Sequence, residues 1–215
     1  MLRSLLACLV LLIATPAGAI TLRAAFEAAG PGEGYDKLVV LEAGVVYTGG
    51  LHVGPILVPE STSYSGEAGL NVKIVGGGAV LDLGGSQLAI SYCPNRLDVE
   101  DCVIVNGSLR YRGLDYEPDR QPRGTVRQVT FYRPHDYALR LQRTGSGIVF
   151  ERNLLVDAVE TGPDWIFNNG YPMDWLQTGL NVALGLGGAP LVRDNWSFRS
   201  NAHENADPLL HFGFL

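Results

Sequence analysis

The amino-acid sequence predicts an all-β protein, a solenoid of stacked parallel coils with a short capping helix at its N-terminal end. Glycine and proline supply 27 and 12 of the 215 residues, which disfavours long helices and favours a chain that turns often. Most of the chain consists of short apolar or alternating runs that end at Gly, Asn, Asp or Pro, as strands do. One such run also recurs about every 25 residues, which is the signature of a repeat architecture.

Composition limits the class of function. With 47% hydrophobic residues and 18% charged ones, the chain can bury a core and is not a disordered tail. Its length fits one domain. The formal net charge is −6 and no Lys/Arg-rich stripe is present, so nucleic acid is not an expected partner.

The segment from Met1 to Ala19 has the three parts of a secretory signal peptide. Arg3 supplies the positive start, residues 4–14 form an apolar run too short to span a bilayer, and Ala17-Gly18-Ala19 offers small residues for cleavage. We therefore expect cleavage after Ala19, a β-helix domain over residues 20–215, a secreted or periplasmic location and no membrane contact after cleavage. An uncleaved anchor and a lipoprotein attached through Cys8 are the alternatives.

The capping helix is expected over residues 21–29. Leu22, Ala25, Phe26 and Ala29 fall on one face at helical spacing, and Thr21 is positioned to cap the start. Gly-Pro-Gly at 30–32 ends the helix. Such a helix would cover the open edge of the first coil, which would otherwise invite strand pairing between molecules.

The repeat is a loose pattern of an aliphatic or aromatic residue, a variable position at +3 and a mostly apolar position at +5. Its starting positions are separated by 25, 27, 24 and 42 residues, and the last step corresponds to one coil plus an insertion of about 17 residues. In the first repeat the pattern is Ile74, Gly77 and Ala79. Asn153 and Asn195 share the +3 position, so we expect their amides to satisfy the bent backbone there. The starting residues are Ile74, Val99, Val126, Phe150 and Val192.

Residues 22–32, Leu-Arg-Ala-Ala-Phe-Glu-Ala-Ala-Gly-Pro-Gly, and residues 41–47, Leu-Glu-Ala-Gly-Val-Val-Tyr, resemble the capping helix, Pro-Gly turn and first coil of the pectate-lyase-like proteins. The resemblance covers about residues 20–200. It implies a right-handed, single-stranded parallel β-helix, an extracytoplasmic location and an acidic polysaccharide as ligand.

The densest polar segment spans residues 132–141. Alternation there turns Leu139 and Leu141 toward the core and Asp136 and Arg140 outward. Pro-His-Asp at 134–136 is similar to the Asp-Pro-His segment of the alginate C5-epimerases, with Arg133 in place of the leading Asp. We therefore expect catalysis from His135, Asp136 and Arg140, with His135 or Arg140 as the base that removes the proton next to a uronate carboxylate.

The alternative for this segment is structural. In that interpretation, His135 and Asp136 form a hydrogen-bonded turn, and Arg140 belongs to a surface ion pair. Projection by the 24-residue step brings Asp136 near Glu160 and Arg140 near Asp164, with neighbouring coils about 4.8 Å apart, and so predicts an outward cluster of these four residues. Asp136, Glu160 and Asp164 would then hold a hard cation such as Ca²⁺, with no other cofactor expected.

The insertion between the last two repeats is rich in aromatic residues. Trp165, Tyr171 and Trp175 stand among polar residues, and such rings either stack on sugars or pin a long loop to the scaffold. Together with Arg133, whose guanidinium suits a uronate carboxylate, they are the expected substrate-binding residues.

The sequence therefore predicts a secreted β-helix protein that binds an anionic, uronic-acid polysaccharide and acts on it as a lyase or C5-epimerase. The rival is a non-catalytic scaffold or adhesion solenoid of the cell envelope.

Cys93 and Cys102 either form a disulfide or remain buried thiols. No capping segment is evident after the last coil, whose open edge would invite strand pairing. We therefore expect a capping partner, end-to-end self-association, or a sequence that is a fragment of a longer chain.

Overall fold

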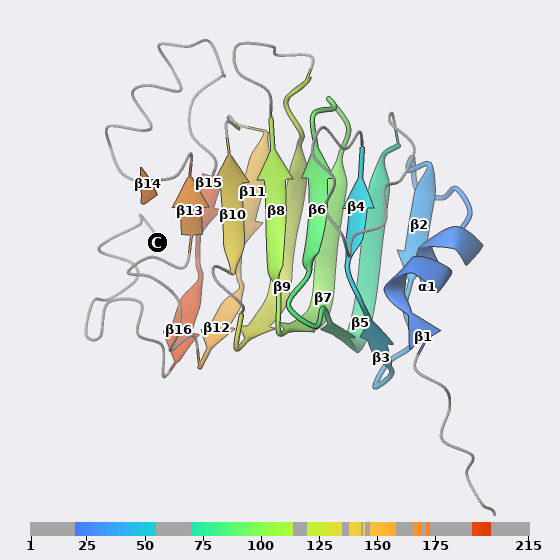
Figure 1. Ribbon diagram of the computed structural model, residues 1–215, viewed down its shortest axis with the longest axis horizontal. Helices are drawn as coiled ribbons and strands as arrows, with labels where there is room; N and C mark the ends of the chain where they lie inside the picture. Colours follow the sequence, from blue (N-terminus) through green and yellow to red (C-terminus); the bar gives the residue numbers. More distant parts are fainter. Residues whose placement is uncertain are drawn as a thin grey trace, which may run out of the picture.

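Two β-sheets and one short helix make up the described structure (Figure 1). The computed structural model describes residues 20–54, 70–113, 120–134, 138–142, 144, 147–157, 166–168, 171–172 and 191–198. Within these ranges the protein is all-β with parallel sheets and little helix, as predicted. The part of the chain so described contains no helix with the length and apolar character needed to cross a membrane.

The first sheet contains the longer strands. They are β1 (Ile20–Thr21), β2 (Lys37–Val40), β3 (Val46–Thr48), β5 (Val72–Asp82), β7 (Leu97–Val105), β9 (Gly124–Tyr132), β11 (Ile148–Glu151), β12 (Leu154–Val156), β15 (Leu191–Arg193) and β16 (Trp196–Phe198). The second sheet contains β4 (Leu51–Val53), β6 (Gln87–Ser91), β8 (Ser108–Arg112), β10 (Leu139–Gln142), β13 (Ile166–Asn168) and β14 (Tyr171–Pro172).

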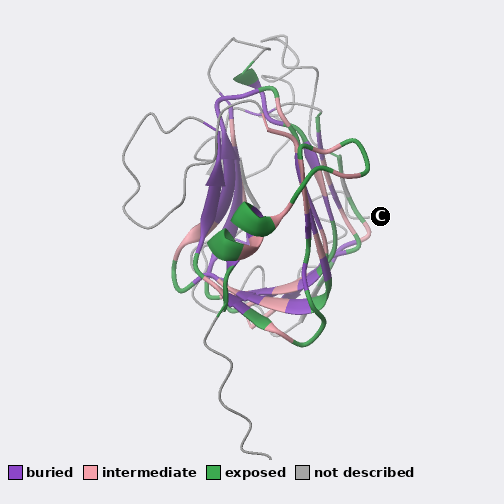
Figure 2. Ribbon diagram, turned by 90° about the vertical axis from the view of Figure 1, so that its right-hand side faces the viewer, coloured by how far each residue is buried: buried purple, intermediate pink, exposed green. Residues whose placement is uncertain are grey.

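From β3 to β10 the chain alternates between the two sheets, so each strand pairs in parallel with the strand two positions along. The short β13–β14 pair is antiparallel. Figure 2, a view along the longest axis, shows the second sheet on the left and the first sheet bending around the right and lower sides. Buried side chains fill the space between the two sheets.

The predicted repeat is confirmed by the register of the first sheet. All five starting residues, from Ile74 to Val192, lie in one ladder across β5, β7, β9, β11 and β15. Within the first repeat, the predicted alignment after Ile74 was wrong. Ala79, not Gly77, is the register partner of Cys102. Two additional residues at the bend cause the shift. A Cβ on Gly76 would lie 2.3 Å from the Cβ of Cys102, so only glycine fits there.

After β5, the first sheet bends in each repeat at one residue in the left-handed conformation, either within a long strand (β7 and β9) or between two short ones (β11 and β12, β15 and β16). The φ angles of these residues lie between 54° and 56°, a backbone conformation that residues other than glycine rarely adopt. The residues are Asp101, Gln128, Arg152 and Asp194. The bend divides the first sheet into a first arm, before these residues, and a second arm, after them. The outward faces of the two arms consequently point in different directions (Figure 2).

Helix α1 (Leu22–Ala28) covers the N-terminal end of the sheets, as predicted (Figures 1 and 2). The hydroxyl of Thr21 accepts a hydrogen bond from the backbone N–H of Ala24 at 3.0 Å and caps the helix. Leu22 and Phe26 are buried in the core. The helix begins one residue later and ends one residue earlier than predicted because Thr21 and Ala29 have extended backbone conformations.

Of the two alternatives for the cysteines, the buried thiols are found. Cys93 and Cys102 are both free and both buried. Burial raises the pKa of Cys102 to about 12, so this thiol stays protonated and unreactive near neutral pH.

Alternating charges line the outward face of the first arm. Glu100 lies 3.0 Å from Lys73 Nζ and accepts a 2.7 Å hydrogen bond from Arg127 Nε. Glu151, the register partner of Arg127 on the other side, accepts a 2.8 Å hydrogen bond from Arg193 Nε. Opposite charges on neighbouring strands support the register of the sheet.

We expect Glu100→Gln to lower the free energy of unfolding at pH 7 by about 1 kcal/mol. Burial of Glu100 raises its pKa, but the hydrogen bonds from Lys73 and Arg127 outweigh burial and lower the pKa below 4.5. A lowered folded-state pKa stabilises the protein above pH 4.5, and this contribution is lost as the pH falls through the folded-state pKa.

Urea unfolding of both proteins at several pH values between 7 and the acid limit of folding measures the effect. The difference between wild type and Glu100→Gln should shrink as the pH falls below 4.5. A difference that stays constant with pH would contradict the role of the charge.

Candidate functional site

The candidate site is the outward face of the second sheet. Leu109 and Tyr111 in β8 and Leu139 and Leu141 in β10 are fully buried in the core. Because side chains alternate along a strand, Arg110 and the outward-predicted Arg140 point away from the core. The two arginines are direct register partners, and their strands lie about 4.8 Å apart.

Further polar residues surround this pair. Arg110 Nη1 donates a 3.1 Å hydrogen bond to Gln87 Oε1 in the neighbouring strand β6. Arg112, two residues further along β8, also lies outward, and its guanidinium stacks 4.9 Å from the centre of the Tyr92 ring. His52 of β4 precedes Arg110 in the same ladder, separated from it by Ala89. We call Arg110, Arg112 and Arg140 the arginine face.

The sign of charge on this sheet is opposite to that of the protein. The full chain carries a formal net charge of −6. In the strands of the second sheet, as far as they are described, there are three arginines and one histidine but no aspartate or glutamate. The described charges of the first arm, in contrast, stand in pairs of opposite sign. A cationic face on an acidic protein is suited to an anionic ligand.

The arginine face is partly shielded from solvent. Arg110 is only 8% exposed and His52 3% exposed, although both point outward, whereas Arg112 and Arg140 are partly exposed. A guanidinium that is partly removed from water attracts a carboxylate more strongly than one in bulk solvent. Planar donors with two parallel N–H groups also bind carboxylates in two-point fashion.

Several of the predicted site residues lie outside the described residues. These are His135, Asp136, Glu160, Asp164, Trp165 and Trp175. Tyr171 lies in β14, but its side chain is not described. Arg140 is the predicted catalytic residue that the structure does describe, and its register partner in β13 is Phe167. The step from Arg140 to its register partner is therefore 27 residues instead of the 24 used in the projection.

Arg133 occupies a corner rather than a strand. It follows β9 and has a φ of 48°. Its guanidinium stacks 5.1 Å from the centre of the Tyr132 ring, and Nε lies 4.0 Å from a carboxylate oxygen of Asp157. With 65% of its side chain exposed, Arg133 can still contact a ligand in solvent.

Sequence reasoning missed Arg110, Arg112 and His52. The available signal was the alternation within Ser108–Arg112, where Leu109 and Tyr111 separate the two arginines. The recurring six-residue pattern follows only the first sheet, so it gave no alignment for the strands of the second sheet.

A half-buried tyrosine in the turn before β2 resembles a candidate base but is unsuited to that role. Tyr35 donates a hydrogen bond to Asp98, which also accepts hydrogen bonds from Arg96 Nε and the Thr125 backbone N–H, both at 2.8 Å. Burial and the hydrogen bond to Asp98 raise the pKa of Tyr35 to about 12. This phenol therefore stays protonated near neutral pH, and the cluster fixes neighbouring strands.

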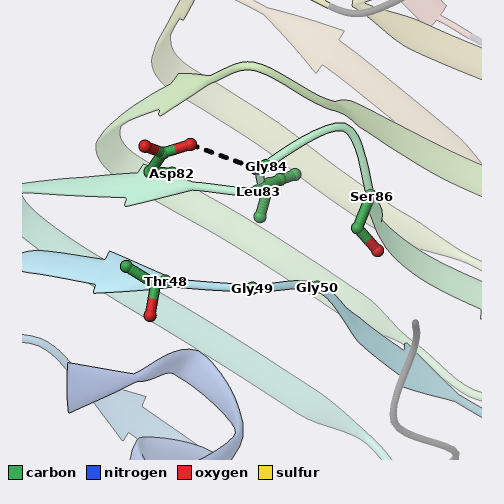
Figure 3. Close-up of a pocket in the computed structure, with 7 residues that line it drawn as sticks. All are labelled: Thr48, Gly49, Gly50, Asp82, Leu83, Gly84 and Ser86. Carbon is green, nitrogen blue, oxygen red and sulfur yellow. Dashed lines mark hydrogen bonds between the residues drawn. The ribbon is translucent and has the colours of Figure 1, made fainter. Parts of the chain in front are cut away.

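A shallow, open hollow of about 320 Å³ lies where β3 and β5 turn toward the second sheet (Figure 3). Its carboxylate, Asp82, accepts hydrogen bonds at 3.1 Å from the Gly84 backbone N–H and from Asn106 Nδ2. Asp82 therefore stabilises the turn. The hollow is lined by Thr48, Gly49, Gly50, Asp82, Leu83, Gly84 and Ser86.

Over the described ranges, no three residues among His, Cys, Asp and Glu gather in a way that could hold a metal ion. The three expected Ca²⁺ ligands lie outside those ranges, so the calcium site stays a prediction.

Comparison of the chain with protein-family models, curated proteins and solved structures gave no match. The resemblance to the pectate-lyase-like proteins therefore rests on the sequence motifs quoted above.

Proposed function

We propose that the protein is a secreted or periplasmic right-handed parallel β-helix of the pectate-lyase-like kind. Three observations support this proposal. Strands alternate between two parallel sheets, the repeats of the first sheet from Ile74 to Phe150 follow one another at nearly constant spacing, and a capped helix covers the first strands. Each property is what a chain wound into stacked coils requires.

The proposed ligand is an anionic, uronic-acid polysaccharide bound on the arginine face. The observation that carries this proposal is the direct register of Arg110 with Arg140 on a sheet whose described strands lack acidic residues. A polymer that crosses the strands would present successive carboxylates to successive strands. Each guanidinium can bind one carboxylate through two parallel hydrogen bonds.

The proposed reaction begins with removal of the proton from the carbon that bears the carboxylate. In a lyase the glycosidic C–O bond then breaks and leaves an unsaturated uronate. In a C5-epimerase a proton returns to the opposite face of the same carbon. Arg140 would neutralise the charge that develops on the carboxylate, and His135, five positions earlier in the chain, is the proposed base.

Ca²⁺ held by Asp136, Glu160 and Asp164 would add to that neutralisation.

The rival function is a non-catalytic scaffold or adhesion solenoid of the cell envelope. Binding to the arginine face without turnover would support this rival.

Incubation with pectate, alginate and a glycosaminoglycan, each with and without Ca²⁺, tests the proposal. Absorbance of unsaturated uronates reports a lyase, and proton NMR of the polymer reports an epimerase. His135→Ala and Arg140→Ala should each lose the turnover. Failure to bind any of these polymers at low salt, with binding no better than to a neutral glucan, would contradict the proposed ligand.

A further inference from the structure

An uncharged, mostly apolar ladder runs along the outward face of the second arm. Its six residues belong to β3, β5, β7, β9, β12 and β16, which lie side by side along the lower edge of Figure 1. We call this row the apolar ladder. It consists of Val46, Val80, Val103, Thr130, Leu154 and Trp196.

The apolar ladder is accessible along its whole length. Val46 at one end is 48% exposed and Trp196 at the other is 55% exposed, while the four residues between them are partly exposed. The next ladder begins with Thr48 and Asp82 and then adds Val105, Tyr132 and Val156, all three partly exposed. Continuous apolar surface of this kind marks interaction sites in soluble proteins. The outward face of the first arm carries ion pairs instead.

The four small side chains of the ladder stand at one end and the two large ones at the other. Valine occupies the first three positions, and threonine, leucine and tryptophan follow. A second copy that runs in the opposite direction would place Trp196 against Val46 of the partner subunit. It would likewise place Leu154 against Val80 of the partner subunit, so both large residues meet small ones, and the small Val103 and Thr130 meet each other at the centre. A copy running in the same direction would place tryptophan on tryptophan and leave a gap between the valines.

We propose that a second copy of this chain docks on the apolar ladder. The two copies are related by a two-fold axis that runs parallel to the strands and passes between β7 and β9. Such isologous pairing makes one self-complementary surface serve both subunits. The sheets would pack about 10 Å apart, as stacked sheets do.

The size of the face sets the strength of association. Five strand spacings of about 4.8 Å give a ladder about 24 Å long. The two ladders together supply fewer residues than the roughly 20–30 per side of a standard interface. We therefore expect a dimer that dissociates in the micromolar range or above.

Sedimentation equilibrium over a range of protein concentrations tests this proposal. Val80→Lys and Leu154→Glu should each weaken the dimer by about tenfold or more, because each places an unpaired charge against an apolar surface. The double variant should recover most of the loss, since the two-fold axis brings these two positions of different subunits together. Within one subunit they lie three strand spacings, about 14 Å, apart.

Val75→Lys is the matched control. Val75 lies on the same strand β5 and is partly exposed, but it belongs to the first arm, where it is the register partner of Glu100. This variant should leave the dimer unchanged, and thermal unfolding verifies that all variants are folded. A monomer at every concentration, or equal weakening by Val75→Lys and Val80→Lys, would overturn the proposal. A double variant as weak as the single ones would overturn the two-fold arrangement.

Discussion

Replacing Asn153 with alanine is expected to lower the free energy of unfolding by about 3–5 kcal/mol. Asn153 is fully buried. Its Oδ1 accepts a 3.0 Å hydrogen bond from the Val129 backbone N–H, and its Nδ2 donates at 3.0 Å to the Val126 carbonyl. The substitution would leave both backbone groups buried without these partners, and each such group costs about 1–3 kcal/mol.

The loss extends to the next repeat. Asn153 Nδ2 also donates a 2.9 Å hydrogen bond to Asn195 Oδ1, and Asn195 Nδ2 donates at 3.0 Å to the Phe150 carbonyl. The two amides therefore satisfy consecutive bends of the first sheet, as the sequence predicted. Removal of the Asn153 side-chain amide deprives Asn195 Oδ1 of one hydrogen-bond donor. The loss of stability therefore exceeds that of one hydrogen bond.

Urea unfolding of Asn153→Ala, with Asn106→Gly as the control, measures this effect. Asn106 is exposed at a turn with a φ of 53°, which glycine adopts without strain, and its Nδ2 donates to Asp82 Oδ1. Water can replace that bond, so the control should lose less than about 1 kcal/mol. Similar losses in the two variants would show that the buried amide is not what stabilises the bend.

The first sheet was predictable because its inward positions recur at nearly constant spacing over most of its length. Within each strand, however, the face on which residues after the bend lie was not predictable in the same way. Asp101, in the left-handed conformation, interrupts the alternation between Glu100, which points outward, and Cys102, which is buried. A rule of strict alternation therefore assigns the wrong face to residues beyond the bend. The three glycines at the bend of β5 added a further shift of two residues.

The second sheet was harder to predict because the turns that lead into it vary in length. Leu51, Leu88, Leu109 and Leu139 form its inward ladder. Leu88 is much closer in sequence to Leu109 than to Leu51, and the step from Leu109 to Leu139 is intermediate. Because these steps have no common period, nothing in the sequence aligned Arg110 with Arg140. The alternation around Arg140 was local to one strand, and this is why its outward position was predicted correctly.

Arg110→Ala is expected to weaken binding of an acidic oligouronate by about 30-fold or more, if the arginine face is the binding surface. Arg110 lies at the centre of that face, between Ala89 and Arg140 in the ladder, and is held by Gln87. Removing one partner from a largely desolvated charge pair costs about 2–5 kcal/mol, and 2 kcal/mol corresponds to about 30-fold in affinity. Calorimetric titration at constant ionic strength measures the change, because salt screens such contacts.

Arg127→Ala is the matched control for net charge. Arg127 lies on the first arm and is paired with Glu100, so its loss removes the same formal charge from a different face. If general attraction between the protein and a polyanion governed binding, both variants would weaken it equally, and the arginine face would have no special role. Arg110→Lys separates charge from geometry, since lysine keeps the charge but lacks the planar two-point donor. Recovery of only part of the affinity by lysine would therefore assign the remainder to the paired hydrogen bonds of the guanidinium.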